Sequence, residues 1–413
     1  MTYLIMLNYL VRNQNFFANA NDRVTKSIQN TGIKKYFTAM SRIILILKDQ
    51  LELLPPVLSC AQVLSSFGLQ LELIVTSCNK STVDEFREKG ITIHCLYSQH
   101  YKKTSRLWVK AIRWLEFRRL AWKTYGRIAT KDDLLWVGSA DTALALGKRL
   151  LSHKYVLHIH ELYDTLPRYR DGLKAYAKSA AAIVVPDMSR AAIFRVWWGL
   201  SKTPFVVPNK PFTHPRRQKI EISDVNIKKQ IDEIGNVPIV LYQGHIVGGR
   251  SLDVVAKAIH NHSLPIRLVL MGKDHGRFVE HLKTLCPNLV PLGFITPPHH
   301  LEVTSHAAIG IIQYNFSCLN HVFCAPNKIW EYSGFGVPTL AADLPSLRYY
   351  LDRYKAGVCC DFDSEDDVAK AIKQIVHERE SYLAGATALY ESYDLSESYQ
   401  SIFKELELCV KQA

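Results

Sequence analysis

The chain is 413 residues long, with 48% hydrophobic and 22% charged residues, and its formal net charge is +13. This composition excludes a disordered, a collagen-like and a disulfide-scaffold protein. Because a single hydrophobic core stops growing at about 250–300 residues, the length predicts two domains.

The positive charge belongs to the first half of the chain. Residues 1–217 carry 33 Lys and Arg against 15 Asp and Glu, a net charge of +18, whereas residues 218–413 carry 18 against 23, a net charge of −5. This asymmetry predicts that the first half meets an anionic partner: phospholipid, nucleic acid or a phosphorylated acceptor.

Three features bear on the cellular compartment. Residues 1–40 are polar and Asn-rich, which predicts either an N-terminal extension or an over-long start assignment. The nine cysteines are scattered and form no C-x-x-C pair, a usage typical of reduced thiols in a cytoplasmic protein. No apolar run approaches the roughly 18–20 residues that cross a bilayer, so any membrane contact is expected to be peripheral.

Residues 41–212 alternate short apolar runs with helical patterns, which predicts a first domain of parallel strands joined by crossover helices. Strands are expected at 43–47, 69–76, 91–96, 133–137, 155–160, 182–185 and 205–207. Helices are expected at 57–67, 81–89, 105–125 and 142–151. Since these strands are almost wholly apolar, helices should cover both faces of the sheet.

Residues 213–236 are rich in Pro and charge and predict a linker with, at most, a short helix. The pattern restarts in a second domain, 237–393, and a C-terminal helix is expected within 394–413. The strands of the second domain are expected at 238–243, 266–271, 289–292, 307–312, 338–341 and 357–360. Its helices are expected at 251–260, 278–285, 326–334, 345–350 and 365–377. The predicted fold class is α/β with two facing, Rossmann-like, doubly wound parallel sheets, which bind ligands at the carboxyl ends of their strands.

A dinucleotide-dependent oxidoreductase would share this architecture, but the sequence argues against it. Neither the G-x-G-x-x-G string nor a P-loop occurs. The second half instead predicts an anion site. Gly244 and Gly272 follow two predicted strands, where a missing side chain allows backbone to approach a ligand. Arg250 begins a predicted helix and adds a fixed cation to the positive end of the helix dipole.

The segment APNKIWEYSGFGVP carries the rest of this predicted site. Pro326 suits the first turn of a helix, so the free N–H groups near Asn327 and Lys328 would face the ligand. Glu331 lies one turn further along the same face, where a carboxylate can accept two hydroxyl hydrogen bonds of the kind a ribose offers.

The runs YQGHIVGGRSLDVVAKAI, LVLMGKDHG, LVPLGFIT and APNKIWEYSGFGVPTLAADLP resemble the nucleotide-sugar domain of retaining GT-B glycosyltransferases of the bacterial group 1 family. The run YVLHIHELYDT resembles the loop of that family that carries its active-site histidine. The resemblance covers about residues 150–380 and implies the GT-B fold. It also implies transfer of a sugar from a nucleoside diphosphate sugar, a uridine diphosphate sugar being favoured, with retention of anomeric configuration and without a metal or other cofactor.

Position by position, the resemblance implies that Glu331 binds the ribose, that Arg250 contacts the diphosphate, with Lys328 beside it, and that His160 lies near the transferred sugar. Two residues depart from the family pattern. Phe323 stands where the first glutamate of a paired motif would fall, and His245 stands where a second diphosphate-binding arginine would fall. A neutral His245 would leave the clamp one cation short.

The implied acceptor is a lipid-linked or polysaccharide hydroxyl in capsule, O-antigen or lipopolysaccharide-like biosynthesis, and the implied location is cytoplasmic, peripheral to the inner face of the membrane. A GT-B sugar-nucleotide epimerase and a glycogen-type phosphorylase are alternatives within the same fold. No feature of the sequence favours either.

Several histidines and an acid have simpler interpretations. His158 and His160 alternate on one predicted strand and point to one face, which could hold zinc, but no further ligand pattern completes such a site. Glu161 is either a general base or a cap of the next turn. The pair 299–300, which follows two prolines, is interpreted as a surface turn.

The segment 101–131 interleaves basic and aromatic residues. The basic stripe consists of Lys102, Lys103, Arg106, Lys110 and Arg113, and the aromatics are Trp108, Trp114, Phe117 and Trp122. A basic amphipathic helix of this kind predicts contact with a membrane surface or acceptor. Two alternatives remain: the aromatics pack on the sheet and the basic side faces water, or the segment belongs to a nucleic-acid-binding protein without transferase activity. No nucleic-acid-binding motif supports the last, so nucleic acid is not expected as a partner.

Overall fold

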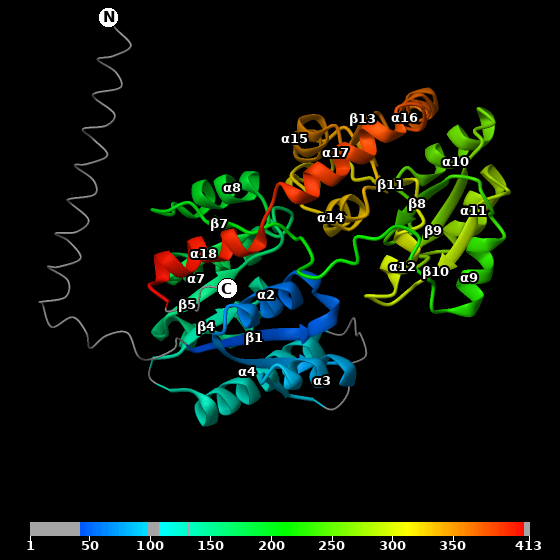
Figure 1. The fold of residues 1–413 in the computed structure, drawn as a ribbon. Helices are drawn as coiled ribbons and strands as arrows, with labels where there is room; N and C mark the ends of the chain where they lie inside the picture. Colours follow the sequence, from blue (N-terminus) through cyan, green and yellow to red (C-terminus); the bar gives the residue numbers. More distant parts are fainter. Residues whose placement is uncertain (1–41, 98–106, 131, 409–413) are drawn as a thin grey trace, which may run out of the picture.

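A computed structural model describes residues 42–97, 107–130 and 132–408. Within them the chain forms two separate parallel sheets, which lie side by side in Figure 1. The fold is therefore α/β with two Rossmann-like, doubly wound halves, as the sequence predicts.

The first sheet has seven strands in the order β3-β2-β1-β4-β5-β6-β7, and every pair is parallel. The strands are β1 (Arg42–Gln50), β2 (Gln70–Ser77), β3 (Thr92–Cys95), β4 (Leu134–Val137), β5 (Tyr155–His158), β6 (Ala182–Val185) and β7 (Phe205–Val206). The helices are α2 (Pro55–Ser66), α3 (Lys80–Glu88), α4 (Leu107–Ile128), α5 (Ala140–Leu146), α6 (Pro167–Gly172), α7 (Lys174–Ser179) and α8 (Met188–Trp198). Two buried apolar clusters cover the two faces of this sheet, because its central strands are apolar on both sides.

The second sheet has six parallel strands in the order β10-β9-β8-β11-β12-β13. The strands are β8 (Ile239–Gln243), β9 (Arg267–Met271), β10 (Val290–Gly293), β11 (Ile309–Ile312), β12 (Thr339–Ala342) and β13 (Gly357–Cys360). The helices are α9 (Val225–Asp232), α10 (Leu252–Asn261), α11 (Phe278–Leu285), α12 (His300–Thr304), α13 (Leu319–Val322), α14 (Asn327–Gly334), α15 (Pro345–Tyr354), α16 (Glu365–His377) and α17 (Arg379–Glu391).

After α17 the chain returns to the first sheet as α18 (Leu395–Leu406), the red helix of Figure 1. The ring of Tyr399 stacks on Trp136 at 5.7 Å, and Phe403 meets Phe67 edge-on at 5.0 Å. Both aromatics of α18 are almost fully buried. The last helix therefore belongs to the hydrophobic core of the first sheet, although it lies nearly 200 residues beyond that sheet in sequence.

The structure differs from the predicted elements in two ways. The single helix predicted at 142–151 is wrong: α5 stops at Leu146, and a short 3-10 helix, Lys148–Ser152, follows. Gly147 makes the break, because its φ is +72° and the guanidinium of Arg118 fills the space that a side chain would need. Several helices were not predicted at all, namely α6, α7, α8, α12, α13 and α17.

Candidate active site

Two glycine loops follow neighbouring strands of the second sheet. The first glycine loop, residues 244–250, follows β8, and the second, residues 272–277, follows β9. Gly244 and Gly272 have φ values of +138° and +154°, and a Cβ on Gly272 would overlap the carbonyl oxygen of Gly244. Only glycine allows the two loops to approach so closely at the carboxyl edge of the sheet.

Two cations lie at the first glycine loop. Arg250 stacks its guanidinium over Tyr314, 4.6 Å from the ring centroid, and donates a 3.1 Å hydrogen bond to the Gln313 carbonyl. Lys328 comes from α14, and its Nζ would lie 2.9 Å from a Cβ built on Gly244. Burial, and then repulsion from Arg250, lower the pKa of Lys328 to about 8. The two positive charges are thus held near each other before any ligand arrives.

The start of α14 adds backbone N–H donors to the site formed by Arg250 and Lys328. The helix begins at Asn327, after Pro326 in extended conformation, and no side chain caps it. Its first N–H groups therefore have no partner within the helix, and they carry the positive end of the helix dipole. Together with Arg250 and Lys328, they form an electropositive place suited to an anion.

Glu331, on the same helix, is buried and already engaged. One carboxylate oxygen accepts a hydrogen bond from the Gln243 amide, and the other lies 3.4 Å from His300 Nε2. Burial by itself would raise the pKa of Glu331, but His300, with Lys328 adding to it, holds that pKa below its usual range. The carboxylate stays charged and keeps lone pairs for further hydroxyl donors.

His160 follows β5 of the first sheet and is buried. Its Nε2 donates a 3.0 Å hydrogen bond to the Gly138 carbonyl, so Nδ1 is the acceptor of the ring. Burial lowers the pKa of His160, and it lowers the pKa of neighbouring His158 further. Both rings are therefore neutral near pH 7.

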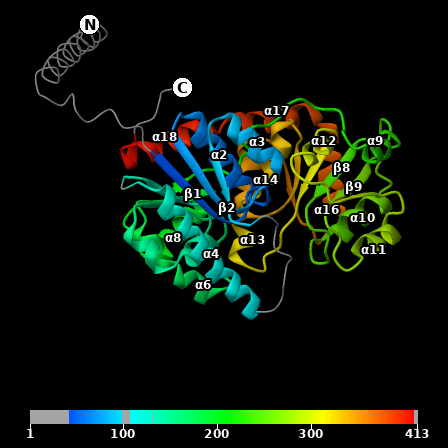
Figure 2. The same ribbon diagram turned by 90° about the horizontal axis from the view of Figure 1, so that it is seen from below.

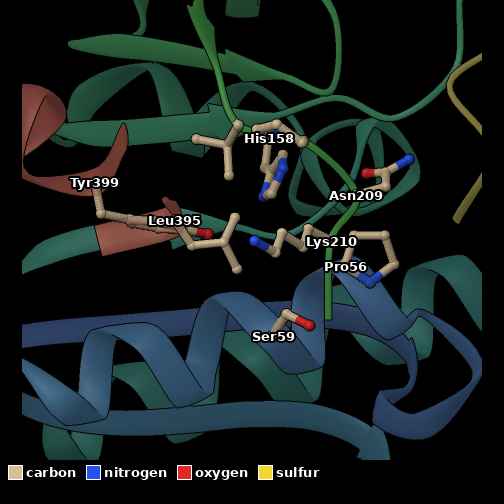
Figure 3. A pocket seen from close by; sticks show the side chains of 9 residues that line it. Pro56, Ser59, His158, Asn209, Lys210, Leu395 and Tyr399 are labelled. Carbon is tan, nitrogen blue, oxygen red and sulfur yellow. The ribbon is translucent and has the colours of Figure 1, made fainter. Parts of the chain in front are cut away.

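His158 and His160 do lie together, with ring centroids 4.3 Å apart. His158 turns into a small interior pocket that also contains Ser59, Lys210 and Tyr399, shown in Figure 3. Within the described residues, no group of three His, Cys, Asp or Glu side chains is arranged to hold a metal ion.

Arg190, on α8, joins the His160 loop to the second half of the molecule. Its side chain is 3% exposed and donates to the carbonyls of His160, Phe323 and Asn320, the last two at 2.9 and 3.3 Å. Glu161, half exposed, lies 3.5 Å from the same guanidinium. In Figure 2, α13, which carries Asn320, reaches the helices of the first half. Arg190 thus links the two halves beside the predicted site.

A second link lies on the next turn of the same loop. The Leu162 N–H donates to the Asn320 side chain at 3.0 Å, and Asp164 accepts from the Leu319 N–H at 2.6 Å. Phe323, at the end of α13, packs its ring against the core of the first sheet. The residue that departs from the paired-glutamate pattern therefore has a packing role.

The basic stripe is only partly described. Lys102, Lys103 and Arg106 lie outside the described residues, whereas Lys110 is exposed and Arg113 half-buried on α4. The aromatics Phe117 and Trp122 are buried against the sheet, as the simpler interpretation predicts. The opposite face of α4 nevertheless exposes three apolar side chains at helical spacing: Trp108 (62%), Ile112 (55%) and Leu115 (60%).

Four site residues were not found from sequence. Gln243, Tyr314 and Arg190 sit in no recognisable motif, and their roles depend on contacts between distant segments. His300 was interpreted as part of a surface turn; this is wrong, because it begins α12 and lies against Glu331. The order of the strands in the sheet brings α12 beside α14, and the local sequence does not indicate that these two helices are in contact.

The whole chain resembles solved glycosyltransferase structures. HepE of Anabaena, solved with UDP and glucose, has a TM-score of 0.65 at 13% identity and covers 89% of this chain and 100% of its own. Sucrose-phosphate synthase of Thermosynechococcus elongatus gives 0.65 at 14% identity, covering 89% and 99%. Trehalose-6-phosphate synthase OtsA gives 0.63 at 12% identity, covering 90% and 100%. No protein-family model matches the chain, and no curated protein matches it by sequence. The chain thus has the GT-B fold.

Proposed function

We propose that this protein transfers a sugar from a nucleoside diphosphate sugar to a hydroxyl group of an acceptor. The observation that carries the proposal is the convergence of Arg250, Lys328 and the first N–H groups of α14 on two touching glycine loops. Such a place stabilises the negative charge that builds up on a departing nucleoside diphosphate. The fold of the UDP-bound HepE structure supports the same proposal.

Each half has its own part in the proposed reaction. The second domain, residues 237–393, binds the sugar donor, favoured to be a UDP-sugar: Glu331 accepts from the ribose hydroxyls, and Gly244, Gly272 and the N-terminus of α14 at Asn327 surround the diphosphate. The first domain, residues 41–212, binds the acceptor, and His160 lies near the transferred sugar. Arg250 and Lys328 supply the charge that a metal supplies elsewhere, and the proposed outcome is retention of configuration.

The first test is thermal denaturation with nucleotides. A ligand held at 100 times its dissociation constant stabilises the folded state by about 2.7 kcal/mol. We expect UDP and a UDP-sugar to raise the melting temperature, with AMP as a control that lacks the diphosphate. If no nucleoside diphosphate, with any base, raises it, the proposed function is wrong. Once a sugar donor is found, release of free sugar without an acceptor would identify an epimerase instead.

The acceptor is proposed to be a lipid-linked or polysaccharide hydroxyl, reached from the inner, cytoplasmic face of the membrane in surface polysaccharide biosynthesis. Across the described residues, no helix has the length and apolarity needed to pass through a bilayer. The exposed apolar face of α4, with the exposed Arg119 one turn beyond Leu115, supports peripheral contact. Apolar side chains with basic neighbours are what an anionic lipid surface attracts.

A vesicle assay tests this surface. Replacing Ile112 and Leu115 by Asp is expected to lower sedimentation with anionic vesicles at least tenfold, because it puts two charges into the apolar face. Val225→Asp changes an even more exposed apolar position, on α9, and is the control that should bind like the wild type. Equal binding by both variants would contradict the membrane proposal. Preferential binding of a single-stranded oligonucleotide over vesicles would favour the nucleic-acid alternative.

A further inference from the structure

Two histidine rings meet where the two glycine loops touch. His245 Nδ1 and His275 Nε2 lie 2.9 Å apart, so one ring donates its N–H to the other, and their centroids are 5.0 Å apart. We call His245 and His275 the histidine pair. Both residues are exposed, so a ligand can reach them.

The backbone fixes the position of the histidine pair. The Ile246 N–H donates to the Lys273 carbonyl and the His275 N–H donates to the Ile246 carbonyl, both at 2.9 Å. The Tyr242 hydroxyl donates to the His245 carbonyl at 2.8 Å. These bonds hold the two loops in register, so the contact between the rings follows from the fold of both loops.

The histidine pair borders the anion site described above. His245 directly follows Gly244, and a Cβ on Gly244 would lie 2.9 Å from Lys328 Nζ. A phosphate group bound by Lys328 at the first glycine loop would therefore lie one residue along the chain from His245. Each protonated ring can donate both of its N–H groups, which makes imidazolium a good partner for phosphate oxygens.

The surroundings of the histidine pair are mostly positive. Besides the histidine pair, the ionisable groups on the two glycine loops, β8 and α14 are Tyr242, Arg250, Lys273, Asp274, Arg277, Lys328, Glu331 and Tyr332. The acid nearest in sequence, Asp274, already accepts the N–H groups of Phe278 and Val279. Glu331 is held by Gln243 and His300. A bound diphosphate adds negative charge at this site, and a nearby negative charge favours the protonated form of an imidazole.

We propose that the histidine pair takes up a proton when the diphosphate binds and then acts as a cation of the diphosphate site. When a nucleoside diphosphate binds, one proton passes from solvent to the ring nitrogen that accepts the bond within the pair. The N–H···N bond then breaks, and both rings donate to phosphate oxygens. Imidazole is suited to this because it changes charge between about pH 5 and 8. The inference rests on the proposed function and adds to it a coupling between donor binding and pH.

Isothermal titration of UDP-glucose and of UDP into the wild-type protein tests the coupling. It is run at pH 7 in buffers of different ionisation enthalpy, with EDTA present. We expect uptake of a large part of one proton, and affinity that weakens by up to about tenfold per pH unit as pH rises from 6 to 7.5. UDP itself would release a proton if its terminal phosphate ionised on binding, which is the opposite sign. Lys328 loses charge mainly above this range, because its pKa is about 8.

Variants distinguish proton uptake by the histidine pair from proton uptake by other groups. His245→Arg should keep tight binding but lower proton uptake and the pH dependence, whereas the double variant His245→Asn/His275→Asn, which removes both candidate acceptor rings, should weaken binding and abolish uptake. His281→Asn, an exposed histidine on α11, should behave as the wild type. Nucleotide binding without proton uptake, or uptake unchanged in both His245 variants, overturns this inference and leaves the proposed function intact. If neither UDP nor UDP-glucose binds, the inference falls for these ligands, and the proposed function itself is judged by the wider nucleotide screen.

Discussion

Arg250→Ala is expected to lower the rate of sugar transfer by about 10²–10³-fold, while the protein still folds. Removal of one preorganised donor to developing negative charge has an effect of this size. Arg250 is preorganised because Tyr314 stacks beneath its guanidinium and the Gln313 carbonyl accepts one N–H. The rate is measured as nucleoside diphosphate released from the sugar donor that thermal denaturation identifies.

Two further variants make this result specific. Arg250→Lys keeps the charge but loses the planar fork and the stacking, so its rate should lie between those of wild type and alanine. Lys257→Ala lies further along α10, where the side chain forms only an exposed ion pair with Glu365 at 3.6 Å, and should leave the rate unchanged. A soluble Arg250→Ala protein with near wild-type turnover would show that this arginine is not part of the clamp.

Arg190→Met is expected to lower both stability and turnover. The substitution leaves the carbonyls of His160, Phe323 and Asn320 without this donor, and a buried acceptor left unsatisfied costs about 1–3 kcal/mol. We therefore expect a loss of about 3 kcal/mol in the free energy of unfolding, measured by urea denaturation. Turnover should fall as well, because the His160 loop is no longer tied to the segment that holds Asn320.

The glycine loops lie in the second sheet and do not contact Arg190, so UDP should still raise the melting temperature of Arg190→Met. This retained shift, combined with a lower turnover number, distinguishes loss of the link between the halves from general unfolding. Arg195→Met is the control on the same helix, since its side chain makes only an exposed hydrogen bond to Thr203. If Arg190→Met matches Arg195→Met in stability and rate, the link made by Arg190 contributes neither to folding nor to turnover.

The sheets were predictable from sequence because their strands are short, apolar and separated by turn residues. All thirteen strands in the described residues were predicted, with their ends within three residues of those observed. The helices that cover the sheets were harder to predict from the sequence. For α8 a signal was present: the Asp187 side chain accepts from the Arg190 N–H, and Gly199 ends the helix in a left-handed conformation. These are a capping residue and a terminating glycine.

The candidate site was predictable only where its residues follow strands. Arg250, Lys328 and Glu331 come from segments that contain their own glycine and proline signals, so their proximity follows from the parallel sheet. The segments of Arg190 and His300 also contain capping or proline signals, but those signals do not indicate what either side chain contacts. Each acts across a contact between segments far apart in the chain, and a sequence without coordinates does not report which distant segments meet.

The return of α18 to the first sheet has a consequence for dissecting the molecule. Leu395, Tyr399, Ile402, Phe403 and Leu406 are part of the core of the first sheet. A polypeptide that ends after β7 therefore lacks the part of its hydrophobic core that α18 supplies, and it exposes the rings of Phe67 and Trp136 to water. The first domain is thus discontinuous in sequence, and a polypeptide that folds as this domain must either carry both segments or be circularly permuted to join them.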